Sequence, residues 1–443
     1  MPEDPPAARR RPVAPPIAPP VAPPVAPWYL AYLILGLINS GLLPFLLPLD
    51  VAGRSHDLGQ VAVVIGAYNA GMLPSPLLGA LAERRQLFRA VFFGGFIALA
   101  VGLVALPEAT RLAWYAPLAL MMGFGVGAAA TVAPLFVIDF VPRPEWEPRI
   151  GWLQSFNGAG QLAGLLLAGA VAGGRLAYGF WLAGGLAGLA LVLGRIGLPR
   201  AAARPGVRLP RLAWAELMRG FSGPGLGGLL QHSHHLRRAA LVRLPRHLRG
   251  RFGRFLLAWG LWSFGTAPFF AYYPLLMAAT YGVAPAATAL VYALAAGIGI
   301  GLFVLAGRVA EARGALLVFR AALSVRMAGF AVLAILAAPG LAGAVPGAAP
   351  LALLGFALIM LAWPALSVAG TGLAAELAPS GKGSAMGLLA ASAAVATVLG
   401  TFLGGWLIVA FGYNVMLLVA IAGLAGAEMA IRRGVCHAGA RRG

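Results

Sequence analysis

The chain has 443 residues, of which 60% are hydrophobic and only 10% are charged. Soluble domains usually contain about 25% charged residues, so this composition excludes an ordinary water-soluble enzyme. The one cysteine, Cys436, excludes an internal disulfide and a zinc cluster built from several thiolates. Lys and Arg outnumber Asp and Glu by 33 to 13, and the location of this charge decides whether it indicates a membrane or nucleic acid.

Residues 1–27 are predicted to form a Pro-rich cytoplasmic tail outside the folded core. Ala-Pro-Pro units repeat from Ala14 to Pro27 and favour an extended polyproline conformation. The apolar run that follows begins too late and is too long for a cleaved signal peptide.

From Trp28 onward, long apolar runs alternate with short polar breaks. A helix needs about 20 apolar residues to cross the hydrocarbon core, and its backbone groups must be satisfied internally. The sequence therefore predicts an all-α polytopic membrane protein with twelve transmembrane helices. The expected spans are 28–49, 60–82, 89–106, 113–138, 150–172, 177–198, 254–279, 285–307, 316–338, 349–371, 383–410 and 412–431.

These spans divide into two bundles of six, residues 28–198 and 254–431, joined by an Arg-rich linker at 199–253. A C-terminal tail follows at 432–443. With twelve spans both termini lie on one side, which holds 29 of the 33 basic residues, whereas the other side holds Arg54, Arg111 and Arg175. The positive-inside rule makes the basic side cytoplasmic, in the plasma (inner) membrane.

The linker mixes leucine and arginine between Leu229 and Leu248. This pattern predicts an interfacial helix held by anionic lipid. Nucleic-acid binding is disfavoured because aromatic and base-reading groups are absent from the segment. The histidines at 232, 234 and 235 have no carboxylate or thiolate neighbours, so a solvated linker is favoured over a metal site.

A short motif occurs once in each half. Gly79-Ala-Leu-Ala-Glu83-Arg-Arg85 ends the second span, and Gly307-Arg-Val-Ala-Glu311-Ala-Arg313 ends the eighth. The fifth and eleventh spans also share a glycine and leucine spacing. Matches in equivalent spans indicate a duplicated six-helix unit.

This motif and the 6+6 layout resemble the major facilitator superfamily (MFS). The resemblance implies the MFS fold, in which two six-helix bundles with pseudo-twofold symmetry enclose one cavity that opens to each side in turn. A conformational latch is expected at Gly79, Glu83, Arg84, Arg85, Gly307, Glu311 and Arg313. The two glycines would allow close helix crossings, and Glu83 would contact the eleventh span near Gly383 and Ser384. The alternative is a topology anchor that only ends the span.

The chain also departs from the family pattern. Glu83 stands where the family motif has Asp, Met121 where the antiporter pattern has Arg, and Gln161 where that pattern has Pro after Gly. These differences weaken a prediction of proton/drug antiport. The Gly-x-Gly-x-Gly run from Gly123 to Gly127 is interpreted as helix packing, because no strand precedes it.

A substrate cavity is predicted from the polar residues inside the spans, because a polar group that faces lipid costs free energy. Helical spacing aligns those of the fifth, seventh and tenth spans into stripes. The predicted cavity residues are Asn39, Asn69, Gln154, Asn157, Gln161, Trp262, Thr266, Trp363 and Ser367. Interhelical hydrogen bonding is the alternative role for these side chains.

Arg326 lies about ten residues into the ninth span. A charge at mid-bilayer costs about 2.5 to 3.5 kcal/mol on insertion scales, so this side chain is expected to snorkel to the cytoplasmic face. The spans place no acid securely at the midplane, so coupling to a proton through a carboxylate is left open.

The leading hypothesis is a secondary transporter that moves a small neutral, amphipathic or weakly charged organic solute by alternating access, with export the expected direction. An importer or facilitator of the same fold is one alternative, and a transport-dead membrane scaffold or sensor is another. An enzyme is disfavoured because the spans contain no catalytic cluster. No catalytic residue, metal or cofactor is predicted.

Overall fold

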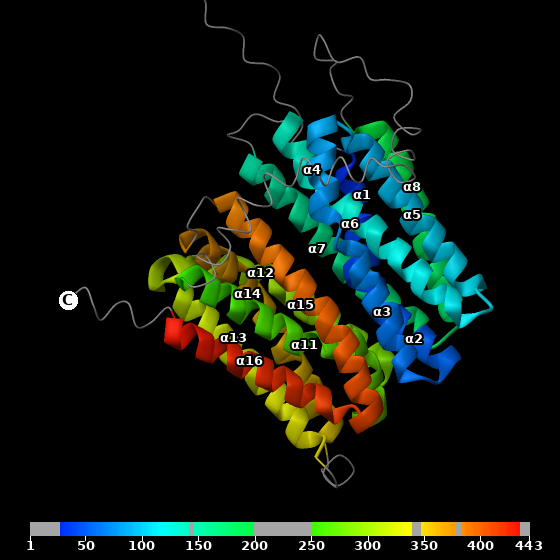
Figure 1. Cartoon of the computed structure of the whole chain (residues 1–443). Helices are drawn as coiled ribbons and strands as arrows, with labels where there is room; N and C mark the ends of the chain where they lie inside the picture. Colours follow the sequence, from blue (N-terminus) through cyan, green and yellow to red (C-terminus); the bar gives the residue numbers. More distant parts are fainter. Residues whose placement is uncertain (1–26, 141–145, 199–249, 339–346, 378–381, 435–443) are drawn as a thin grey trace, which may run out of the picture.

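The computed structural model describes residues 27–140, 146–198, 250–338, 347–377 and 382–434, and every regular element in these ranges is helical (Figure 1). The first bundle contains a first rod of α1 (Tyr29–Gly36), η1 (Leu37–Leu42) and α2 (Leu43–Ser55), a second of α3 (Leu58–Met72) and α4 (Ser75–Arg85), then α5 (Phe88–Glu108), η2 (Leu112–Trp114), α6 (Tyr115–Phe140), α7 (Trp146–Val171) and α8 (Leu176–Gly197). The second bundle contains α11 (Arg251–Tyr281), α12 (Pro285–Arg313), α13 (Ala315–Leu336), α14 (Ala348–Glu376), α15 (Lys382–Phe411) and α16 (Asn414–Gly434).

Local sequence signals mark the ends of these helices. Asp57 caps α3, where its carboxylate accepts a 2.8 Å hydrogen bond from the Gly59 backbone N–H. Pro285 begins α12, where its missing N–H costs nothing. Gly282 ends α11 at a positive φ of 64°, a conformation that glycine adopts without strain.

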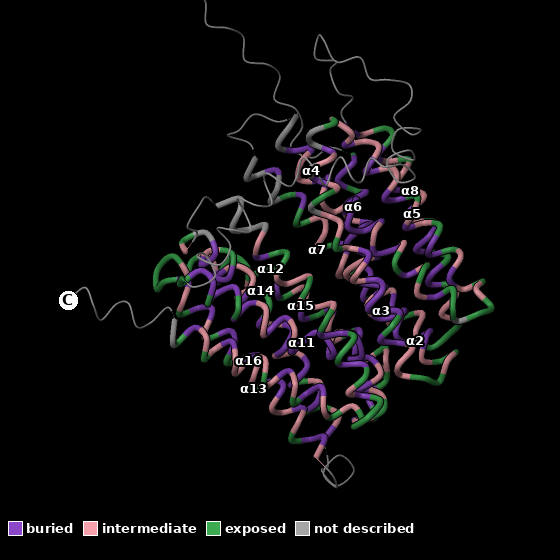
Figure 2. Tube along the Cα trace, viewed as in Figure 1, coloured by how far each residue is buried: buried purple, intermediate pink, exposed green. Residues whose placement is uncertain are grey.

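In the described ranges the helices form twelve rods, and ten of these are long and apolar enough to cross a membrane. The two outside this set are α7 and α11, whose polar and aromatic residues lower their hydropathy. Buried residues occupy the interior of both bundles in Figure 2, and exposed apolar residues cover much of the outer surface. The all-helical membrane fold expected from the sequence is therefore confirmed. The tails, and nearly all of the linker at 199–253, lie outside the described residues.

The first rod is interrupted by a π-helical turn at Leu37–Leu42. It packs backbone against backbone on α7, because a Cβ at Gly36, Gly160 or Gly164 would overlap a carbonyl oxygen of the facing helix. Such crossings of small residues are typical of membrane helices. The π turn contains Asn39, and single π turns occur frequently at functional sites.

Two pairs of helices carry most of the packing between the bundles. α3 packs against α15, and α7 packs against α12, with smaller contributions from α2 and α3 against α11. These pairs meet at the end of the molecule where α2 ends and α3 begins, which is here named the closed end. The ribbons diverge toward the end where α4 ends and α7 begins, here named the open end (Figure 1).

Candidate solute-binding site

At the closed end, several contacts join the two bundles. Tyr272 Oη donates a 2.5 Å hydrogen bond to the Leu58 carbonyl, and Asn69 Nδ2 lies 3.4 Å from Thr401 Oγ1. A Cβ on Gly66 would lie 2.6 Å from the Phe402 ring, which therefore presses against the α3 backbone. These contacts close one side of the space between the bundles.

Toward the open end, α7 and α12 lie apart from each other. A Cβ would meet no atom within 4 Å at Gly158 of α7 or at Gly301 and Gly307 of α12. Gln154 lies two turns before Gln161 on the same face of α7, and its side chain is exposed. The space between the bundles therefore widens toward the open end.

Between these two regions, side chains of both bundles meet. Gln161 of α7 is 3.5 Å from the hydroxyl of Tyr292 on α12, in a long hydrogen bond. The Tyr292 ring packs edge-on against Tyr273, with ring centroids 5.9 Å apart, and Tyr273 packs in the same way on Phe45 of α2 at 5.6 Å. This cluster forms the inner limit of the open space.

The expected snorkelling of Arg326 is wrong. The residue lies at the middle of α13 and is 1% exposed. Its Cζ atom lies 5.1 Å from the ring centroids of both Trp262 and Phe270 on α11, at a distance typical of cation–π contacts. The two rings, which the sequence does not place beside α13, stabilise the charge inside the bundle.

Two tryptophans extend this cluster toward open space. The rings of Trp262 and Trp363 are 6.0 Å apart, so α11 and α14 bring two predicted cavity residues together. Trp363 is 43% exposed, whereas Trp262 is buried and its Nε1–H has no partner among the described residues. An apolar surface next to an unpaired donor suits an amphipathic solute.

The remaining predicted cavity residues divide into three groups. Asn157 and Ser367 are half-buried, and the Asn157 backbone contacts Gly36 of α1. Asn39 accepts a 2.6 Å hydrogen bond from Tyr68 within the first bundle, and Asn69 bridges to the second bundle through Thr401. Thr266 is expected to line the cavity, but it is buried and its hydroxyl donates to the Trp262 carbonyl of its own helix.

The latch residues are described in part. Gly79 is a close crossing, as expected, because a Cβ there would lie 2.7 Å from Thr131 Cγ2. The corresponding expectation for Gly307 is wrong, since nothing lies within 4 Å of a Cβ at that position. Arg85, Glu311 and Arg313 are exposed at the ends of their helices. The side chains of Glu83, Arg84 and Ser384 are not among those that the structure describes.

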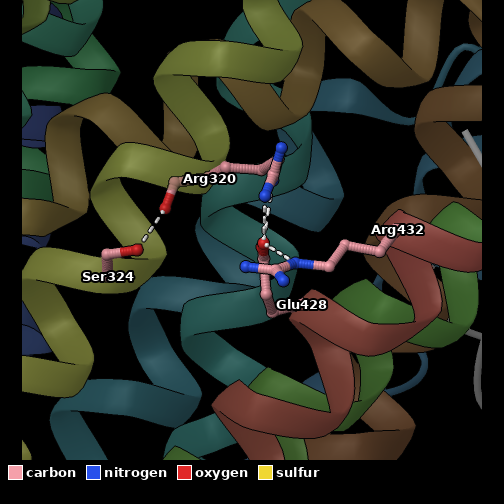
Figure 3. A network of polar contacts seen from close by, with 4 residues as sticks. All are labelled: Arg320, Ser324, Glu428 and Arg432. Atoms are coloured by element: carbon pink, nitrogen blue, oxygen red, sulfur yellow. Dashed lines mark hydrogen bonds and ion pairs between the residues drawn. The ribbon is translucent and has the colours of Figure 1, made fainter. Parts of the chain in front are cut away.

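A network of charges that the sequence analysis did not identify joins α13 to α16 (Figure 3). Glu428 Oε1 accepts hydrogen bonds from Arg320 Nε and Arg432 Nε, both at 2.8 Å, and lies 2.7 Å from Arg320 Nη2. The Glu-x-x-x-Arg spacing of Glu428 and Arg432 is visible in the sequence. The contact with Arg320 depends on how α13 packs against α16, which no local spacing predicts.

A separate pocket lies near the closed end of the first bundle, at the end of α2. It has a volume of about 440 Å³ and is lined by residues that include Arg175 and Trp181. Asp50 is buried beside it and pairs with Arg54 at 3.1 Å, rather than lying at a solvated edge as its position in the sequence suggests. Within the described ranges, no three His, Cys, Asp or Glu side chains are grouped so that they could hold a metal ion.

The sequence model of the Major Facilitator Superfamily matches residues 28–369. The chain belongs to this superfamily of membrane transport proteins, and it is a transporter rather than an enzyme. No curated protein matches the chain.

Solved structures show the same fold. The nucleoside transporter NupG has a TM-score of 0.66 at 14% identity, with 91% of this chain and 97% of that chain covered. A D-xylose-proton symporter has a TM-score of 0.64 at 17% identity, with coverage of 92% and 95%. A POT family transporter in complex with 5-aminolevulinic acid has a TM-score of 0.67 at 13% identity, with coverage of 91% and 94%. At these identities the similarity establishes the architecture and not the solute.

Proposed function

We propose that the protein is a secondary active transporter that moves a small organic solute by alternating access, with export as the direction. The observation that carries this proposal is the cluster at the bundle interface, where Gln161 of one bundle meets Tyr292 of the other. A solute held between two bodies is exposed to one side when they tilt one way, and to the other side when they tilt back.

The charge pattern supports an orientation. Basic residues gather at the open end, which the positive-inside rule places in the cytoplasm together with both termini. The structure would then be the cytoplasm-open state, ready to take up a cytoplasmic solute, in an inner (plasma) membrane. Import and facilitated diffusion use the same state and are the alternatives.

Solute flux in proteoliposomes, measured with and without an imposed pH gradient, tests the proposal. Flux driven by the gradient indicates coupling to protons, and flux that only follows the solute gradient indicates a facilitator. Absence of flux for every solute that binds the purified protein would contradict transport and favour a scaffold or sensor.

The predicted site and latch residues have separate expected roles. Gln161→Ala and Asn157→Ala are expected to weaken solute binding, because the two amides lie one turn apart on the face of α7 at which Gln161 meets Tyr292 of the other bundle. Glu83→Ala is expected to change turnover with a smaller effect on binding, because a latch shifts the balance between states. Equal effects of all three substitutions on binding would contradict this division.

The Arg-rich linker is proposed to contact anionic lipid of the inner leaflet. Deletion of residues 220–247 should then leave flux in neutral-lipid proteoliposomes unchanged. A loss of flux there would indicate that the linker acts on the bundles themselves.

A further inference from the structure

Arg326 is a buried arginine without an anionic partner among the described residues. It is 1% exposed, and its Nε and Nη1 atoms have no hydrogen-bond partner in the described structure. The described carboxylates are placed elsewhere: Asp50 pairs with Arg54, Glu428 pairs with Arg320 and Arg432, Asp57 caps α3, and Glu108, Glu311 and Glu376 lie at helix ends. A buried guanidinium without a counter-ion carries a desolvation cost that an anion would offset.

The two aromatic contacts of Arg326 do not supply a counter-ion. Cation–π contacts with Trp262 and Phe270 involve the delocalised charge above the rings, and they leave N–H donors of the guanidinium unused. Such a guanidinium is preorganised for a carboxylate, sulfonate or phosphate, which can accept two parallel hydrogen bonds from it.

The tryptophan beside Arg326 carries an unused donor too. Its Nε1–H is buried without a partner in the described structure, and its ring contacts the Arg326 guanidinium. At the bundle interface, the Tyr292 hydroxyl accepts a long hydrogen bond from Gln161, which leaves its own O–H as a further donor. Unpaired donors beside a buried guanidinium complement an anion rather than a cation or a neutral sugar.

The walls of the same region indicate the rest of the solute. Trp363 is exposed and packs on Trp262, the residue whose ring also contacts Arg326. An aromatic or other flat apolar group can pack against the Trp363 ring while its acidic group points toward α13.

We propose that the transported solute is a small organic anion, and that Arg326 binds its acidic group while Trp262 and Trp363 contact its apolar body. This inference rests on the proposed transport function and narrows the solute class given above from neutral or weakly charged to anionic. Arg326 is then a specificity-determining residue contributed by α13.

The test compares acids with neutral molecules of the same shape. The full-length protein, purified in detergent, is titrated with benzoate and benzamide, and with benzenesulfonate and benzenesulfonamide, while thermal unfolding is followed. Each acid is expected to raise the unfolding temperature and each amide to raise it less or not at all, because a ligand of the native state stabilises it. Equal shifts within both pairs, or no shift with either acid, would overturn the proposal.

Substitutions locate the effect. R326Q should weaken binding of the acids about tenfold or more, since hydrogen bonds to a charged group contribute at least this factor, and leave the amides unaffected. R320Q is the matched control: it removes an arginine from the same helix, and it should keep the acid response even if it lowers the baseline stability. An R326Q protein that retains the full acid response would contradict the assignment.

A measurement on the unmodified chain keeps the proposal testable if R326Q fails to fold. Phenylglyoxal modification, mapped by mass spectrometry, should reach Arg326 from the open end and should be slowed by benzenesulfonate but not by benzenesulfonamide. An unreactive Arg326 would show an arginine enclosed for structural reasons alone, and equal protection by both compounds would show that Arg326 does not recognise the acidic group. Acid binding without flux in proteoliposomes would contradict the proposed transport function but not the anion-binding site. Flux of neutral solutes alone would contradict the proposal that the solute is an anion but not the transport function.

Discussion

Two arginines six residues apart on α13 have opposite surroundings. Arg320 is 33% exposed and is bonded to Glu428, so its charge is compensated within the protein. Arg326, about 9 Å farther along the helix axis, is buried between two aromatic rings and has no carboxylate partner among the described residues. The compensated charge joins α13 to α16, and the uncompensated charge is the one that we propose binds the solute.

The largest effect on stability is expected from Glu428→Ala. This change leaves both Arg320 and Arg432 without the carboxylate that they share, and breaking partly buried, charge-assisted hydrogen bonds costs about 2 kcal/mol. Equilibrium unfolding in detergent measures the loss. An unchanged unfolding free energy would mean that the network in Figure 3 contributes nothing to the packing of α13 on α16.

Arg320→Gln is expected to lower the unfolding free energy by about 1 kcal/mol, because Arg432 still donates to Glu428 after the change. Solute flux per folded molecule should stay as in the wild type. A selective loss of flux would place Arg320 with Arg326 and remove the contrast between them.

Arg326→Met should leave the unfolding free energy within about 0.5 kcal/mol of the wild type or raise it, because replacing an unpaired buried charge by an apolar side chain of similar length removes a desolvation cost. Solute binding should be lost in the same protein. A loss of several kcal/mol would indicate that Arg326 is a structural residue held by its rings.

Among the three residues of the charge network, the smallest loss of stability is expected from Arg432→Gln. This side chain is 65% exposed, and exposed ion pairs contribute less than about 1 kcal/mol. Added salt should reduce the small difference further, since exposed charges are screened. A loss as large as that of Glu428→Ala would show that Arg432, rather than Arg320, makes the important contact.

Hydropathy predicts the helices of this protein because the bilayer imposes one physical rule on every span. The polar stripe of α7 follows from helix periodicity, and the close crossing at Gly79 follows from the repeated motif. The surroundings of Arg326 could not be predicted in this way. The penalty for a charge in lipid favours snorkelling, but the rings of Trp262 and Phe270 on another helix offset part of that penalty, and local sequence does not reveal them.

Two further differences have the same origin. Gly307 occupies the position equivalent to Gly79 in the repeat, yet a Cβ there would contact nothing, because the motif does not determine which helix packs against that face. Thr266 belongs to a regular stripe with Trp262, but its hydroxyl bonds to its own helix instead of pointing into open space. Periodicity identifies which residues share a face, and the packing of the helices determines what that face meets.

The most direct test of this account is entry of radiolabelled benzenesulfonate into proteoliposomes, because this anion stays charged at ordinary pH and crosses lipid slowly. The account predicts saturable entry with the wild-type protein and with R320Q, and entry at the protein-free rate with R326Q. Entry at the protein-free rate with the wild type, or equal entry with wild type and R326Q, would contradict it.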